Sequence, residues 1–156
     1  MHDIVATEVD REASLTYTIK AQFDSTVSPA KLSRWLTTAE GIAGWWSDKV
    51  EGEADKVGDV FRVTFPTSPV VFVLRVSARD DHVVEWRIDE DPPWWKGTTI
   101  RFEATEKEGG STLLFTHGGF EADDPIIPVI TPAWVRFLDN LVEVAQTDTP
   151  NPAVRN

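Results

Sequence analysis

The chain has 156 residues and contains no cysteine. This length is typical of a single domain, and the absence of cysteine excludes disulfides, thiolate metal sites and a cysteine nucleophile. Acidic residues outnumber basic ones by 26 to 15, so the formal net charge is -11. This charge opposes binding to nucleic acid and to anionic membranes. The acidic N-terminus lacks a signal-peptide pattern and no apolar run is long enough to cross a bilayer, so we expect a cytoplasmic protein without membrane insertion.

The first third of the chain predicts one strand and two short helices. Residues 1–14 are interpreted as a polar lead-in. Apolar and polar residues then alternate from residue 15 to residue 23, which is typical of a half-buried strand. Ser28 followed by Pro29 predicts a helix N-terminus. Thr38, with Gly41 shortly after it, predicts a second short helical turn that leads into Trp45 and Trp46.

From about residue 49 the pattern predicts strand after strand. Alternation marks segments near residues 60–65, 72–77, 84–88, 100–103 and 113–115. Asp80-Asp81 and Gly109-Gly110 are typical turn sequences between these segments. An acidic loop rich in proline, residues 89–93, ends in Trp94-Trp95. The last strand is expected to end at His117, before two glycines.

A long amphipathic helix is predicted near the C-terminus. Thr131-Pro132 marks its expected start. Apolar residues then recur at helical spacing at Trp134, Phe137, Leu138, Leu141, Val142 and Ala145. About sixteen residues would form a rod of roughly 24 Å, long enough to lie along a small sheet. Residues 147–156 are expected to form a flexible tail, which leaves residues 15–146 as the domain.

The predicted fold class is therefore α+β. A curved antiparallel sheet of about six to seven strands would wrap around the long C-terminal helix, with two short helices after the first strand. A sheet with one apolar face must be covered, and this helix is the only predicted element long enough to cover it. Since a bent sheet leaves space beneath the helix, we expect a cavity between them.

An ordered series of short motifs carries a family resemblance. The series runs through Pro29-x-x-Leu32-x-x-Trp35-Leu36, Ile42-x-x-Trp45-Trp46, Gly58-Asp59-x-Phe61, Val84-x-Trp86, Gly110-Ser111-Thr112-x-Leu114, His117-Gly118-Gly119-Phe120 and Trp134-x-x-x-Leu138-x-x-Leu141. It resembles the START-like (SRPBCC) helix-grip superfamily, in the branch of homologues of the activator of the heat-shock-protein-90 ATPase (its C-terminal domain). The resemblance implies a helix-grip fold with an apolar cavity. It implies no single chemistry, because members of the superfamily bind lipids, steroids and polyketides and a minority are enzymes. Ala133 departs from the family's usual glycine before the tryptophan.

Residues on the inward face of the predicted elements are the candidates for a ligand-binding cavity. They are Tyr17, Trp46, Phe61, Val63, Phe72, Leu74, Trp86, Ile100, Phe102, Trp134, Phe137, Leu138 and Leu141. Core filling is the competing interpretation for most of the tryptophans. Adjacent tryptophans tend to point in different directions, so Trp45, Trp94 and Trp95 are candidates for the mouth of the cavity.

Three functions remain open at this point. The first is binding of a small apolar or aromatic ligand, with a link to stress response. The second, which rests on the resemblance alone, is a protein that contacts a heat-shock chaperone. The third is an enzyme of cyclase, dehydratase or hydrolase type that uses Tyr17 and His117 as acid and base; for His117 the alternative is a hydrogen bond to loop backbone. Asn140 is a further polar candidate in the cavity. No metal and no cofactor are predicted, and a monomer or homodimer is expected.

Overall fold

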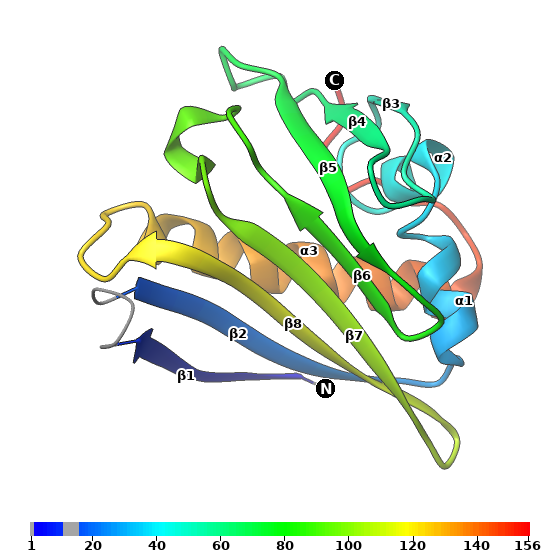
Figure 1. Ribbon diagram of the computed structural model, residues 1–156. Coiled ribbons are helices and arrows are strands. Elements are labelled where there is room, and N and C mark those ends of the chain that lie inside the picture. The colour runs from blue at the N-terminus through cyan, green and yellow to red at the C-terminus, as the bar shows by residue number, and fades with distance from the viewer. Residues whose placement is uncertain (1, 11–15) are drawn as a thin grey trace.

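The computed structural model describes residues 2–10, as backbone only, and residues 16–156 (Figure 1). Within these residues the chain forms one eight-stranded antiparallel sheet with three α-helices and a short 3-10 helix. The elements are β1 (His2–Asp10), β2 (Thr16–Ser25), α1 (Pro29–Arg34), α2 (Ala39–Ala43), β3 (Val50–Gly52), β4 (Val60–Val63), β5 (Phe72–Arg79), β6 (Val83–Arg87), η1 (Pro93–Trp95), β7 (Thr99–Lys107), β8 (Gly110–Glu121) and α3 (Ile127–Thr147).

The strand order is β1-β2-β8-β7-β6-β5-β4-β3, so α1 and α2 form the crossover from one half of the sheet to the opposite edge. The helix α3 lies behind the sheet and crosses it (Figure 1). This arrangement confirms the predicted α+β fold with a long C-terminal helix and two short helices after the inner strand β2. The edge strand β1 was not predicted, because its mixture of acids and apolar residues shows no alternation. The predicted domain boundary at residues 14 and 15 lies outside the described residues.

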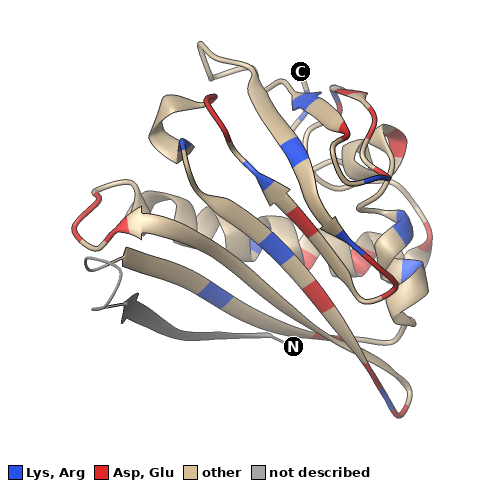
Figure 2. Ribbon diagram, in the orientation of Figure 1, with Lys and Arg blue, Asp and Glu red and all other residues tan. Residues whose placement is uncertain are grey.

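The two faces of the sheet differ in chemistry. The face that α3 covers is apolar and contributes fully buried side chains such as Phe61, Trp86 and Phe102. Charged residues recur along β5, β6 and β7 (Figure 2), and in the burial pattern they alternate with the buried ones. They include cross-strand ion pairs, for example between Arg101 and Glu85 at 3.1 Å. The alternation read from the sequence therefore separates core from solvent as expected.

The short helices begin where the sequence predicts. The Ser28 hydroxyl accepts a hydrogen bond from the amide of Lys31 at 3.2 Å, and the Thr38 hydroxyl accepts one from the amide of Gly41 at 2.9 Å. Each hydroxyl satisfies a backbone donor that the first helical turn leaves open. These caps explain why two such short helices form in succession.

Two element boundaries differ from the prediction. The helix α3 begins at Ile127 rather than at Thr131, so Pro132 lies inside it. The Thr131 hydroxyl donates to the carbonyl of Ile127 at 2.7 Å, next to the turn in which proline supplies no amide donor. The strand β8 continues past His117 to Glu121, because a register shift against β2 and a positive φ of 100° at Gly119 form a bulge instead of an end.

The C-terminal segment, residues 148–156, is bound to the domain, which differs from the expected flexible tail. The amide of Asn151 donates to the carbonyl of Gly44 at 2.8 Å, and the amide of Val154 donates to that of Trp46 at 2.9 Å. The amide of Asp48 donates back to the carbonyl of Val154 at 3.0 Å. These bonds satisfy carbonyls that the short helix α2 leaves open at its end. Backbone pairing of this kind leaves no pattern in the side chains, so the sequence did not indicate it.

Candidate ligand-binding site

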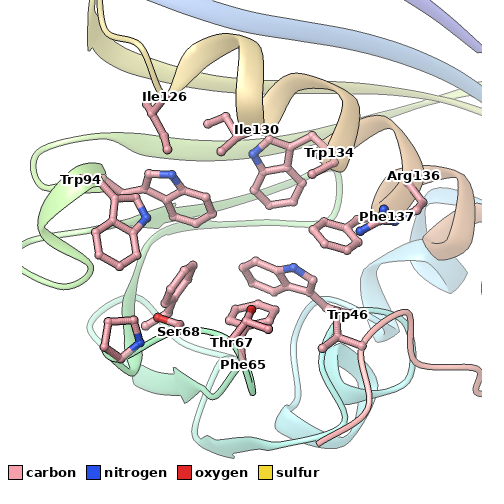
Figure 3. A pocket seen from close by; sticks show the side chains of 15 residues that line it. Trp46, Phe65, Thr67, Ser68, Trp94, Ile126, Ile130, Trp134, Arg136 and Phe137 are labelled. Carbon is pink, nitrogen blue, oxygen red and sulfur yellow. The ribbon is translucent and has the colours of Figure 1, made fainter.

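A pocket of about 490 Å³ opens between the first half of α3 and the end of the sheet near β4 and β5. Its walls come from α3, the loop between β4 and β5, the short helix η1, the turn after α2 and the C-terminal segment. Figure 3 shows the labelled side chains around one open space. The lining residues are Trp46, Phe65, Thr67, Ser68, Pro69, Phe72, Trp94, Trp95, Ile126, Ile130, Ala133, Trp134, Arg136, Phe137 and Val154.

Five of these side chains form a closed series of ring contacts, which we call the aromatic collar. In order around the series they are Trp46, Phe65, Phe72, Trp95 and Trp134. The distances between successive ring centroids are 5.5, 4.7, 4.9 and 5.9 Å, and 5.4 Å closes the series from Trp134 back to Trp46. All five lie in the range in which aromatic pairs attract one another. Because each ring contacts two others, the collar holds the pocket wall in a defined shape.

Two indole nitrogens of the collar have no partner. Nε1 of Trp46 and Nε1 of Trp95 are buried and make no hydrogen bond to any described residue. A buried donor without an acceptor costs about 1–3 kcal/mol. The wall of the pocket therefore contains two donors whose hydrogen-bonding capacity is unused.

The polar groups of the pocket lie at its mouth. Arg136 is an exposed residue of α3, and its guanidinium carbon lies 5.1 Å from the centroid of the Phe137 ring. This distance is short enough for a cation–π interaction, which orients the guanidinium along the rim. On the opposite side, the Ser68 hydroxyl donates to the carbonyl of Val70 at 2.7 Å. The neighbouring Thr67 is exposed.

His117 lies behind the collar and is fully buried. Nε1 of Trp134 donates to Nδ1 of His117 at 3.0 Å. An indole nitrogen can only donate, so Nδ1 must carry the lone pair and Nε2 the proton. Nε2 lies 2.9 Å from the hydroxyl of Thr98, which in turn donates to the carbonyl of Trp95 at 2.6 Å. The three bonds thus run in one direction, through a neutral imidazole.

The surroundings of His117 keep the ring uncharged. Burial lowers its pKa from the ordinary 6.5 to about 3. A proton on Nδ1 would also point at the N–H of Trp134. The ring does not line the pocket; instead it connects Trp134 with Thr98 and, through it, with Trp95. Its role in this structure is to position two tryptophans of the collar. Its hydrogen-bond partners are the Trp134 indole and the Thr98 hydroxyl, which are side chains and not the loop backbone expected as the alternative to a general base.

Tyr17 and Asn140, the other polar candidates, lie away from the pocket. Tyr17 lines a separate, open hollow beside the loop between β8 and α3. The Asn140 amide nitrogen donates to the carbonyls of Trp45 and Asn151, at 2.8 and 2.7 Å. Asn140 therefore fastens the C-terminal segment to α3. The structure does not bring Tyr17 and His117 together at one cavity, so the acid and base named for an enzyme do not share a site.

The predicted cavity residues divide into two groups. Trp46, Phe72, Trp134 and Phe137 line the pocket, as do the mouth candidates Trp94 and Trp95. A second group is part of the packed core, and each of its side chains is at most 1% exposed. Its members are Phe61, Val63, Leu74, Trp86, Ile100, Phe102, Leu138 and Leu141. Among the described residues, side chains are packed beneath Leu138 and Leu141 of α3, and the pocket lies beside the N-terminal half of this helix.

Trp45 also lies elsewhere than predicted. It is fully buried, its ring stacks on Trp46 at 5.7 Å, and its Nε1 donates to the carbonyl of Trp35 at 2.7 Å. The two tryptophans follow α2 in a helical turn, so the strand-like alternation of directions does not apply to them. In the other pair the expectation holds, because Trp94 is 38% exposed and Trp95 only 5%.

Several lining residues were not identified from the sequence. Phe65 belongs to the alternating segment predicted near residues 60–65 but was not named as a cavity residue, and an earlier helix start would have included Ile130 and Ala133. Arg136 and Val154 carried no such signal. Arg136 lies on the polar side of the predicted helix, and Val154 belongs to the segment expected to be flexible.

The curved antiparallel sheet, the long helix across it and the pocket at one end define a helix-grip protein of the START-like superfamily. Residues 26–146 match the sequence profile of the family described as Activator of Hsp90 ATPase homolog 1-like protein. The chain belongs to this family. No helix among the described residues combines the length and the apolar character that crossing a membrane requires.

Solved structures share this fold. The Aha1 dimer from Colwellia psychrerythraea is 24% identical, with a TM-score of 0.75 over 83% of this chain and 96% of that one. Protein MLL2253 from Mesorhizobium loti is 21% identical, with a TM-score of 0.69 over 81% and 95%. CalU16 from Micromonospora echinospora is 14% identical, with a TM-score of 0.68 over 97% and 87%. At these identities the likeness shows the fold alone. No curated protein sequence matches the chain.

Proposed function

We propose that this protein binds a small apolar or aromatic molecule in the pocket between α3 and the sheet. The observation that carries the proposal is the aromatic collar around a space of about 490 Å³. Small-molecule sites typically enclose about 300–1,000 Å³ and are lined mainly by apolar and aromatic side chains. A solid helix-grip core would need no such space, and the ring contacts of the collar keep it from collapsing.

The pocket favours binding over catalysis. Arg136 is the one charged side chain among the described residues that line the pocket, and a guanidinium has hydrogen-bond donors but no acceptor. The buried His117 is neutral, points its two ring nitrogens at protein groups and lies outside the lining. Acid–base chemistry needs a titrating group within reach of the substrate. The named candidates do not supply one here.

The test is direct titration with a neutral aromatic probe, N-phenyl-1-naphthylamine, followed by calorimetry and by tryptophan fluorescence. Ala133→Leu would fill the pocket from α3 without disfavouring the helix, because leucine is a good helix former. The matched control is Ala30→Leu, at an exposed position of α1. We expect one probe per chain for the wild type and the control, and binding at least tenfold weaker for Ala133→Leu. Failure of the wild type to bind any aromatic or apolar probe would refute the proposal.

The remaining functional predictions rest on similarity to other proteins and not on the geometry of the pocket. A link to stress response and contact with a heat-shock chaperone follow from the family resemblance alone. A homodimer is proposed by analogy with the relative from Colwellia psychrerythraea, which is described as a dimer. A cytoplasmic location stays a prediction. Co-purification with a chaperone from the native cell would test the chaperone contact. The mass of the particle in solution would test the homodimer.

A further inference from the structure

The charge of the pocket lining is one-sided. Although the chain as a whole has a net charge of -11, no Asp or Glu appears among the described residues that line the pocket. The single charged side chain there is the cationic Arg136. Within this lining, a positively charged group of a ligand would face Arg136 and no acid, whereas Asp139 and Glu143 border Arg136 only in a separate hollow on the outer side of α3. A ligand with a negative charge would find its complement.

The position of Arg136 suits an anchoring role. Helical spacing places it on the turn that also carries Trp134 and Phe137, at the outer edge of the pocket (Figure 3). Its contact with the Phe137 ring, at 5.1 Å, holds the guanidinium beside the opening. A planar guanidinium can bind the two oxygens of a carboxylate or sulfonate with parallel hydrogen bonds. Thr67 and Ser68 place hydroxyl groups on the facing rim.

The interior wall points to the same polarity. Among the described side chains of the wall, the buried indole N–H groups of Trp46 and Trp95 have no hydrogen-bond partner. An indole N–H can only donate, so an oxygen acceptor is complementary to such a group and a second donor is not. The unused capacity of the pocket therefore matches a molecule that is rich in acceptors.

We propose that the ligand is an aromatic, multi-ring molecule with an anionic oxygen group that Arg136 binds at the mouth, while its rings lie within the aromatic collar. This inference rests on the proposed function, since it names the chemistry of the molecule that fills the same pocket. The aromatic body supplies most of the buried area. The anionic group sets the orientation, with its charge towards solvent and its rings inward.

Two probes that share one body separate the two claims. 1-Anilinonaphthalene-8-sulfonate carries a sulfonate, and N-phenyl-1-naphthylamine has the same rings without it. Both are titrated by calorimetry into the wild type, Arg136→Gln and Arg62→Gln. Arg62 is an exposed residue of β4 outside the pocket, so its variant removes the same net charge elsewhere. Thermal melts show that each variant is folded.

The inference predicts that the wild type binds the sulfonate about fivefold more tightly than the neutral probe, the upper end of what one well-placed ion pair contributes at an exposed rim. Arg136→Gln should abolish this preference and leave the neutral probe unaffected, and Arg62→Gln should change neither. Equal affinities for the two probes, or a preference that survives Arg136→Gln, would overturn the inference and leave the proposed function standing. If neither probe binds, the proposed function fails and the inference fails with it.

Discussion

The buried His117 makes the stability of the fold depend on pH in a predictable window. Its pKa lies at about 3 in the folded protein and at the ordinary 6.5 once the chain is unfolded. Below pH 6.5 the unfolded chain binds a proton that the folded chain does not, so stability falls as the pH falls. From pH 8 to pH 5 this one group should lower the free energy of unfolding by about 2 kcal/mol, since each pKa unit is worth about 1.36 kcal/mol.

The assay compares urea unfolding of the wild type and of His117→Gln at several pH values from 8 to 5. The variant should be less stable at pH 8 because it loses the hydrogen bonds of the imidazole ring. Since glutamine does not titrate, its free energy of unfolding should fall by about 2 kcal/mol less than that of the wild type on acidification. Subtracting one curve from the other removes the contribution of groups common to both proteins. An NMR titration of the His117 ring, expected to stay neutral down to pH 4, covers the case in which the variant does not fold. Parallel curves, or a ring that is protonated near pH 6, would refute the assigned tautomer and its hydrogen bonds.

Two further substitutions test the packing around the pocket. Asn140→Ala removes the bonds to the carbonyls of Trp45 and Asn151 and should cost about 1–2 kcal/mol, with faster amide hydrogen exchange at Asn151 and Val154. The control is Gln146→Ala on the same helix, because the Gln146 side chain accepts a hydrogen bond from the amide of Thr26 and not from the C-terminal segment. Unchanged exchange in Asn140→Ala would show that Asn140 does not hold the segment. Gly44→Ala places a Cβ 2.7 Å from the Trp35 ring and should lower stability by about 1–3 kcal/mol in thermal melts, and a melting temperature equal to that of the wild type would contradict this close contact.

Local sequence signals account for most of the fold. Ser28 and Thr38 predict the helix starts because a capping hydroxyl acts within three residues of its own position. Alternation predicts strands β4 to β8 because one face of the sheet is buried by α3 and the other carries paired charges. The residues at which strands and helices begin and end are harder to predict, since they depend on partners far away in the sequence. The bulge at Gly119, for example, exists only in pairing with β2.

The pocket could be predicted only in part, for a geometric reason. Periodicity identifies inward-facing residues but does not say where the helix and the sheet diverge. Trp46 and Trp134 line the pocket, whereas Trp86 faces inward just as they do and is packed between Phe61 and Phe102. The hydrogen-bond partners of His117 could not be predicted from the sequence either, because Trp134 and Thr98 contact its ring only after α3 packs on the sheet.

The most direct test of the pocket is an NMR titration of the tryptophan side chains. The chain contains seven tryptophans, and each gives one indole N–H signal. With N-phenyl-1-naphthylamine as the probe, we predict that the signals of Trp46, Trp94, Trp95 and Trp134 move most, while that of Trp35, which does not line the pocket, stays in place. If the four signals stay in place at saturating probe, or if Trp35 moves most, no ligand occupies the space under α3 and the central claim is contradicted.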